Sequence, residues 1–244
     1  MSNFFYKFTA GFCMGIAEIT PGISGATIAG LFNVYQGFIS FLTALNPVKL
    51  TSGFKFFFKH IDFNFIMPLL FGMAVSIYLS AFAIDFLINS YLFEFKIFLS
   101  LVMFFAVLKN CCFDQSVKDS MKFLLSFFLG IVIALVIATS LIQFDFNNIF
   151  LLIVAGLLAF TAFLLPGISG SLVLVILGVY DGVILSIKAL DLYSLLPLIA
   201  GMALSFLIVP TQILKQFKSN LIQTKVLFSG LIFGSVPAVW LHLI

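Results

Sequence analysis

Two five-residue segments of identical sequence hold the residue types in this chain that are best suited to binding chemistry. Pro-Gly-Ile-Ser-Gly occupies residues 21–25 and recurs at residues 166–170. Proline removes a backbone donor and disfavours helix at the preceding residue, while glycine permits unusual dihedral angles. We therefore predict that a helix ends near Ile19 and that another begins near Ser24, whose hydroxyl is an N-cap candidate. The second segment predicts an equivalent break, with Ser169 in the like position.

A helix that restarts after such a break can bind an anion. Its first turn presents free N–H groups and the positive end of the helix dipole. All 12 basic residues are lysine, so an anion must be bound by lysine, by hydroxyls or by backbone N–H groups and not by a bidentate guanidinium. The predicted phosphate-binding residues are the glycines and hydroxyl residues of the two breaks: Gly22, Ser24, Gly25, Thr27, Gly167, Ser169, Gly170 and Ser171.

Composition indicates that most of the chain lies in a lipid bilayer. Of 244 residues, 63% are hydrophobic and 9% are charged, whereas a soluble domain carries about 25% charged residues. A membrane-spanning helix needs roughly 20 mostly apolar residues. No Asp, Glu or Lys occurs in residues 63–84, 123–144, 146–180, 192–214 or 226–241, and only Glu18 interrupts residues 8–48.

Glu18 is the only acidic residue in the stretch 8–48 and stands three positions before Pro21. Carboxylates inside a membrane are costly and usually functional. We predict that Glu18 either carries a coupling proton or accepts N–H groups at the break. Phe163 is its counterpart in the second copy, so only the first break carries an acid.

Five further residues are secondary site candidates: Tyr35, Tyr180, Asp181, Lys96 and Lys225. The two tyrosines occupy equivalent positions after the breaks, and the two lysines are equivalent by repeat. The lysines either meet a phosphate on opposite membrane faces or extend to lipid headgroups.

The chain contains an internal repeat. The Pro-Gly-Ile-Ser-Gly segments lie 145 residues apart, and Val-Tyr follows each of them ten residues after the break. A second block repeats at an offset of 129 residues, in which Pro68-Leu69 matches Pro197-Leu198 and Gly72-Met73-Ala74 matches Gly201-Met202-Ala203. The change of offset indicates an insertion within residues 46–62 of the first copy, which alternates lysines with aromatic residues and is typical of a segment lying on anionic lipid.

The predicted fold is an all-α polytopic membrane protein with two inverted repeats, each a broken re-entrant hairpin followed by two transmembrane helices. The predicted segments are residues 1–110 (hairpin 10–45, spans 64–88 and 94–109), residues 111–145 (a loop and the linking span 121–143) and residues 146–244 (hairpin 147–187, spans 193–214 and 224–243).

The lysines predict the orientation of this arrangement, because cytoplasmic loops carry an excess of positive charge. With a cytoplasmic N-terminus and re-entrant hairpins, ten lysines lie inside and only Lys96 and Lys188 lie outside. The single linking span then inverts the second copy relative to the first. Inverted repeats with discontinuous helices near the midplane recur among transporters.

The residues around the two breaks also resemble a known family. Met14–Thr27, the later Leu165–Ser171 and Gly178-Val179-Tyr180, and the closing Gly230–Ser235 are similar to the bacterial PopT-type undecaprenyl-phosphate translocases. The resemblance covers nearly the whole chain. It implies that the substrate is a polyprenyl-phosphate carrier lipid, which the protein returns to the cytoplasmic leaflet of the bacterial inner membrane after envelope polymers are assembled.

Other functions remain to be weighed against this one. A secondary transporter or channel for a small soluble anion is the alternative, and it predicts a closed aqueous pocket. A membrane enzyme acting on lipid phosphates is disfavoured, because the chain has no His/Asp/Arg phosphatase constellation and no paired acids for a metal. The expected partners are the lipid substrate, membrane lipids and a proton or sodium ion, with no cofactor, metal or nucleic acid; the oligomeric state is left open.

Overall fold

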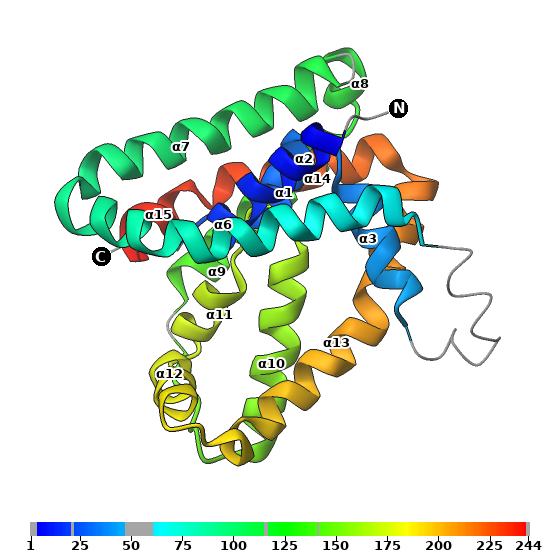
Figure 1. Cartoon of the computed structure of the whole chain (residues 1–244). Coiled ribbons are helices and arrows are strands. Elements are labelled where there is room, and N and C mark those ends of the chain that lie inside the picture. Colours follow the sequence, from blue (N-terminus) through cyan, green and yellow to red (C-terminus); the bar gives the residue numbers. More distant parts are fainter. Residues whose placement is uncertain (1–3, 21, 47–60, 115–116, 141, 243–244) are drawn as a thin grey trace.

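The computed structural model describes residues 4–20, 22–46, 61–114, 117–140 and 142–242, and all the regular secondary structure in those ranges is helical (Figure 1). Residues 47–60 of the predicted lipid-surface insert lie outside the described residues. The helices are α1 (Phe4–Ile19), α2 (Gly25–Leu31), α3 (Tyr35–Ala44), α6 (Phe63–Ser90), α7 (Leu92–Leu108), the π-helix η1 (Lys109–Phe113), α8 (Val117–Met121), α9 (Leu124–Thr139), α10 (Ile149–Leu164), α11 (Gly170–Ile176), α12 (Tyr180–Lys188), α13 (Leu192–Ser219), α14 (Leu221–Gly234) and α15 (Val236–His242).

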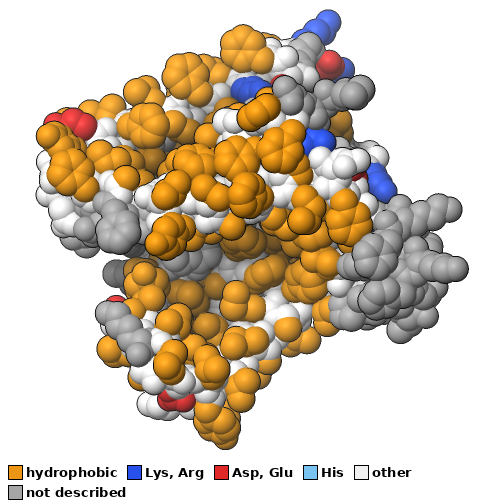
Figure 2. Space-filling view, in the orientation of Figure 1, with side chains coloured by type: hydrophobic (Ala, Val, Ile, Leu, Met, Phe, Trp, Pro, Cys, Tyr) orange, Lys and Arg blue, Asp and Glu red, His pale blue; other side chains and the backbone are white. Residues whose placement is uncertain are grey.

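The outer surface of these helices is apolar, as in a protein surrounded by lipid. Side chains such as Phe71, Leu125 and Phe150 are 58%, 84% and 70% exposed, and apolar side chains cover most of the face in Figure 2. Among the described residues, three stretches are long and apolar enough to cross a membrane: Phe63–Ser80, Leu192–Ser219 and Leu221–Leu241. The chain is therefore an all-helical membrane protein, as the sequence predicts.

The helix pair that follows the second break is sharply bent. The axes of α11 and α12 differ by 114°, the geometry of a broken span or a re-entrant loop. The α9 helix ends before the predicted limit of the linking span because the chain after it becomes extended. There the Ile142 N–H and the Phe144 N–H donate to the carbonyls of Ile176 and Leu177 at the end of α11.

The helices recur in the same order and with closely matching lengths. Both α1 and α10 have 16 residues, and both α2 and α11 have 7. Both α6 and α13 have 28 residues. An aspartate caps each of these long helices, since Asp62 accepts the Phe65 N–H and the equivalent Asp191 accepts the Ser194 N–H. The sequence repeat is thus a repeat of local structure.

Glycine contacts hold the first helix of each copy against its long helix. In the first copy, α1 packs along α6 so closely that a Cβ at Gly11 would overlap the Leu69 carbonyl oxygen. In the second copy, α10 packs along α13, and a Cβ at Gly156 would overlap the Leu198 carbonyl oxygen. Small residues let helix backbones approach in a membrane, where there is little hydrophobic force between helices. Both copies use the same packing contact.

Candidate functional site

The first break forms where the sequence predicts it. The α1 helix ends at Ile19, and Ser24 is the N-cap of α2 with extended dihedral angles. The Ser24 Oγ accepts the Ala26 N–H at 3.1 Å. Gly22 has a φ of +90°, a conformation that residues with a Cβ rarely adopt. The predicted N-cap is therefore confirmed.

The first turn of α2 has fewer free donors than the sequence analysis expects. The Gly25 N–H donates to Glu18 Oε1 at 2.7 Å, and the Thr27 N–H donates to the Ser24 carbonyl at 2.9 Å. The expectation of free N–H groups is not met here, because a carboxylate from the preceding helix occupies the position an anion would take. Acceptance of an N–H group at the break is one of the two roles predicted for Glu18.

The two breaks contact each other directly, although they lie 145 residues apart. The Gly167 N–H donates to Thr27 Oγ1 at 2.8 Å, and both groups are buried. The Tyr35 hydroxyl donates to the Leu164 carbonyl at 2.7 Å, also in a buried position. Both bonds run from the α2–α3 region to the second break. They join the two copies at the points where their helices are interrupted.

The second break differs from the first in its use of hydroxyl groups. Ser169 precedes α11, but its side chain makes no capping bond. Its Oγ lies 2.8 Å from the Ser171 Oγ instead. Gly167 has a φ of +96°, and a Cβ there would lie 2.6 Å from the Ile232 backbone nitrogen. At the start of α11, Phe163 stands in the place of Glu18, and no carboxylate of the described residues accepts the Gly170 N–H.

Four of the secondary candidates lie in different surroundings. Tyr35 is 4% exposed and packs against Phe217 and Phe228, whereas Tyr180 is 37% exposed. Asp181 is exposed on α12. Lys96 donates to the Trp240 carbonyl at 3.3 Å and lies over the Trp240 ring. The structure does not bring these four residues together.

Lys225, the fifth secondary candidate, belongs to a cluster of three charges. Its Nζ lies 3.0 Å from Asp114 Oδ2, and Lys109 Nζ lies 2.9 Å from Asp114 Oδ1. Burial raises the pKa of Asp114, but the hydrogen bonds and charges of Lys109 and Lys225 outweigh it, so the pKa lies below its usual value. Two cations share one carboxylate, which leaves the cluster with one excess positive charge.

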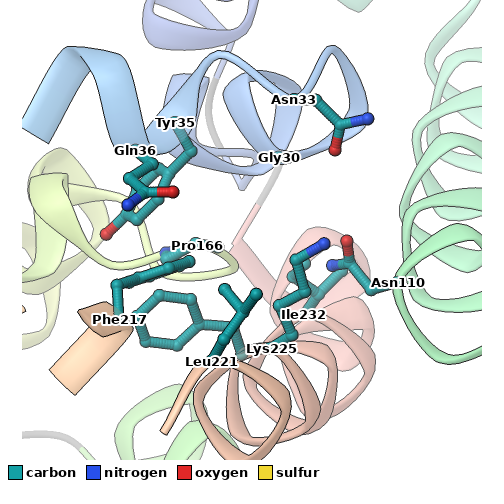
Figure 3. Close-up of a pocket in the computed structure, with 11 residues that line it drawn as sticks. Gly30, Asn33, Tyr35, Gln36, Asn110, Pro166, Phe217, Leu221, Lys225 and Ile232 are labelled. Atoms are coloured by element: carbon teal, nitrogen blue, oxygen red, sulfur yellow. The ribbon is translucent and has the colours of Figure 1, made fainter. Parts of the chain in front are cut away.

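A cavity of about 170 Å³ opens beside this cluster, between the two copies (Figure 3). Its polar lining comprises Asn33, Tyr35, Gln36, Asn110 and Lys225. Its apolar lining includes Pro166 of the second break, Phe217 and Phe228. No Asp or Glu of the described chain lines it, so its charge is positive and suits an anion.

Several polar residues of this cavity, and one of the charge cluster beside it, are not among the candidates predicted from the sequence. They are Asn33, Gln36 and Asn110 of the cavity lining and Asp114 of the cluster. One usable signal was present: Lys109, Asn110 and Asp114 gather polar groups at the end of a long apolar helix. Nothing in their spacing shows that Asp114 meets a lysine 111 residues further along the chain.

Comparison with known proteins identifies the family of this chain. The model of the undecaprenyl phosphate translocase-like family matches residues 14–243. A polyprenyl-phosphate transporter of Vibrio cholerae is 28% identical in an alignment 251 positions long, which covers 98% of this chain and 78% of that protein. No solved structure matches. The match extends over almost the whole chain, including both breaks, and the chain therefore belongs to the undecaprenyl phosphate translocase-like family.

Proposed function

We propose that this protein is a transporter that moves a polyprenyl phosphate across the bacterial cytoplasmic membrane and returns the carrier lipid to the cytoplasmic leaflet. The observation that carries the proposal is the direct contact of the two helix breaks, from the Gly167 N–H to Thr27 Oγ1 at 2.8 Å. Broken backbone is tolerated at membrane depth only where it is buried in protein or lines a wet cavity. The family and the name of the Vibrio cholerae relative support the same substrate.

In this proposal the two copies are inverted in the membrane and the N-terminus is cytoplasmic. The positions of the two long helices support the inversion. In Figure 1, α6 starts near the N-terminus of the chain, whereas the equivalent α13 starts at the opposite end of the molecule. The lysines visible in Figure 2 gather at the end near α8, as expected for a cytoplasmic face. Each hairpin then approaches the midplane from its own side.

The orientation can be tested by labelling single cysteines from one side of the membrane. In a background without the native cysteines, we expect Lys55→Cys to react only from the cytoplasmic side and Lys188→Cys only from the outside. Reaction of both from the same side would refute the inverted topology.

The phosphate headgroup passes between the two breaks in this proposal. The eight residues of the predicted site line the passage: Gly22, Ser24, Gly25, Thr27, Gly167, Ser169, Gly170 and Ser171. In this proposal the Glu18 carboxylate, which accepts the Gly25 N–H at 2.7 Å, competes with the phosphate for the start of α2. Protonation of Glu18 would weaken this bond, because a neutral carboxyl is a weaker acceptor than a carboxylate. The phosphate could then compete for the Gly25 N–H, which would couple the movement of the lipid to a proton.

The deciding experiment is leaflet translocation in liposomes that contain the purified protein. A labelled polyprenyl phosphate is compared with a similarly labelled ordinary phospholipid, under proton and sodium gradients. We expect selective movement of the polyprenyl phosphate, reduced by the double substitution of Ser24→Ala with Ser169→Ala. Failure to move it under either gradient, together with uptake of a soluble anion, would favour a small-anion transporter.

A further inference from the structure

The cavity between the two copies has the size and position of a headgroup site on the lysine-rich side of the breaks. Its volume of about 170 Å³ is more than ten times the roughly 10–15 Å³ that one water needs. Pro166 brings the second break to its wall, while Asn33 and Gln36 come from the link between α2 and α3 and the start of α3. A group bound there would touch both copies at once.

The cation at this cavity is Lys225. Its side chain is 22% exposed, and one bond, of 3.0 Å, joins it to Asp114. An ammonium group has three donors, so donors remain for a second anion. A phosphate monoester carries about −1.5 to −2 charges at pH 7 and three acceptor oxygens. It therefore competes well with a single carboxylate for Lys225.

Asn110 supplies a second polar group beside Lys225. It belongs to the π-helix η1, is 7% exposed and lines the cavity. Its side-chain amide has no hydrogen bond to a described residue, and it is open to the cavity and not sealed in the interior, so it is available to a ligand. Figure 3 shows the polar ends of Asn110 and Lys225 at the same end of the cavity. Single turns of π-helix are frequent at functional sites.

Asp114 can give up Lys225 without becoming an unpaired charge. It also accepts from Lys109 Nζ, at 2.9 Å and 3.0 Å, and Lys109 is not part of the cavity lining. When an anion takes Lys225, the pair of Asp114 and Lys109 remains. A carboxylate with only one lysine would lose its sole partner, which is costly for a partly buried charge.

We infer that this cavity binds the phosphate monoester headgroup through Lys225 and Asn110, and that Asp114 occupies Lys225 in the empty state as an internal competitor. The inference rests on the proposed function, because it assigns a site to the same substrate class. The aromatic and aliphatic part of the lining, with Phe217 and Phe228, then contacts the first isoprene units.

The test is equilibrium binding of farnesyl phosphate, a short prenyl monophosphate, to the purified full-length protein, with farnesol and inorganic phosphate as separate probes. We expect Lys225→Gln to weaken farnesyl phosphate binding about tenfold or more, since a charge-assisted hydrogen bond is lost. Asn110→Leu should weaken farnesyl phosphate binding severalfold. It tests the same site if the Lys225→Gln variant does not fold. Farnesol should bind weakly and equally to all variants.

The competitor role predicts a change in the opposite direction. Asp114→Asn should tighten farnesyl phosphate binding severalfold, whereas Lys109→Gln should weaken it, because Asp114 then has only Lys225 as a partner. The matched charge controls are Asp119→Asn and Lys122→Gln, in an exposed ion pair of 2.8 Å away from the cavity lining. If the Asp114 and Asp119 substitutions changed farnesyl phosphate binding equally, the cause would be the general change in charge, and Asp114 would not be an internal competitor.

The outcomes separate this inference from the proposed function. Translocation and binding that survive both Lys225→Gln and Asn110→Leu would overturn the cavity as the headgroup site and leave the transporter intact. Inorganic phosphate that binds as tightly as farnesyl phosphate would make the cavity a site for a free anion and overturn its assignment to the lipid. If the wild-type protein neither binds nor moves the prenyl phosphate, the proposed function itself is wrong.

Discussion

The bond between the two breaks makes a direct prediction for Thr27→Val. Thr27 is 0% exposed, and its Oγ1 is the acceptor for the Gly167 N–H. Valine has nearly the same shape but no acceptor, so the substitution leaves a buried N–H group without a partner. Such a loss costs about 1–3 kcal/mol. For a chain of about this length, each 1 kcal/mol lowers the unfolding midpoint by roughly 2–4 °C, which gives about 2–12 °C.

The assay is thermal unfolding of the detergent-purified protein, followed by circular dichroism. The matched control is Thr224→Val, because Thr224 is also buried and its hydroxyl donates only to carbonyls within the α13–α14 corner. The Asn220 carbonyl keeps the Thr224 backbone N–H as a donor after the substitution. We expect the control to shift the midpoint by much less. Equal shifts for the two variants, or no shift for Thr27→Val, would refute the reasoning.

Three further predictions concern coupling, packing and pH. Glu18→Gln retains an oxygen for the Gly25 N–H but cannot carry a proton, so transport should become insensitive to pH with the fold retained; an unchanged pH profile in liposomes would refute the coupling role. Gly156→Leu should abolish monodisperse protein in size-exclusion chromatography because its Cβ overlaps the α13 backbone, whereas Gly30→Ala, with open space around it, should not. Because the pKa of Asp114 is lowered, its ion pairs stabilise the protein above its usual pKa of about 3.9 and are lost only as pH falls through the lower value. The difference in unfolding midpoint between wild type and Asp114→Asn should therefore stay constant from pH 5 to pH 8.

The sequence predicts the helix breaks well because their causes are local. Pro166 and Gly167 restrict or release backbone angles whatever surrounds them, and Ser24 caps α2 through a bond to a residue two positions away. The repeat is equally visible, because matching residues at offsets of 145 and 129 form helices of equal length, such as α1 and α10 or α6 and α13. The long apolar runs show that the chain is a membrane protein, and they can be recognised without knowing how the helices pack.

The donors at the first break show where this local reasoning stops. A free helix N-terminus is expected from the sequence around Ser24, but the Gly25 N–H is already bonded to Glu18. Acceptance of N–H groups is one of two roles that the sequence predicts for Glu18, but the sequence cannot place its side chain. Its position depends on how α1 and α2 turn back on each other, since a Cβ at Gly25 would meet Glu18 Oε1.

The sequence by itself determined the membrane class, the repeat and the two breaks of this protein, because backbone chemistry and hydropathy act over a few residues. Only the tertiary structure decided that Thr27 meets Gly167, that Asp114 is shared by Lys109 and Lys225, and that Asn110 faces a cavity between the copies. The Thr27–Gly167 and Asp114–Lys225 contacts join residues that are 140 and 111 positions apart. They form only when the two copies pack together, and the spacing of residues within either copy does not specify that packing.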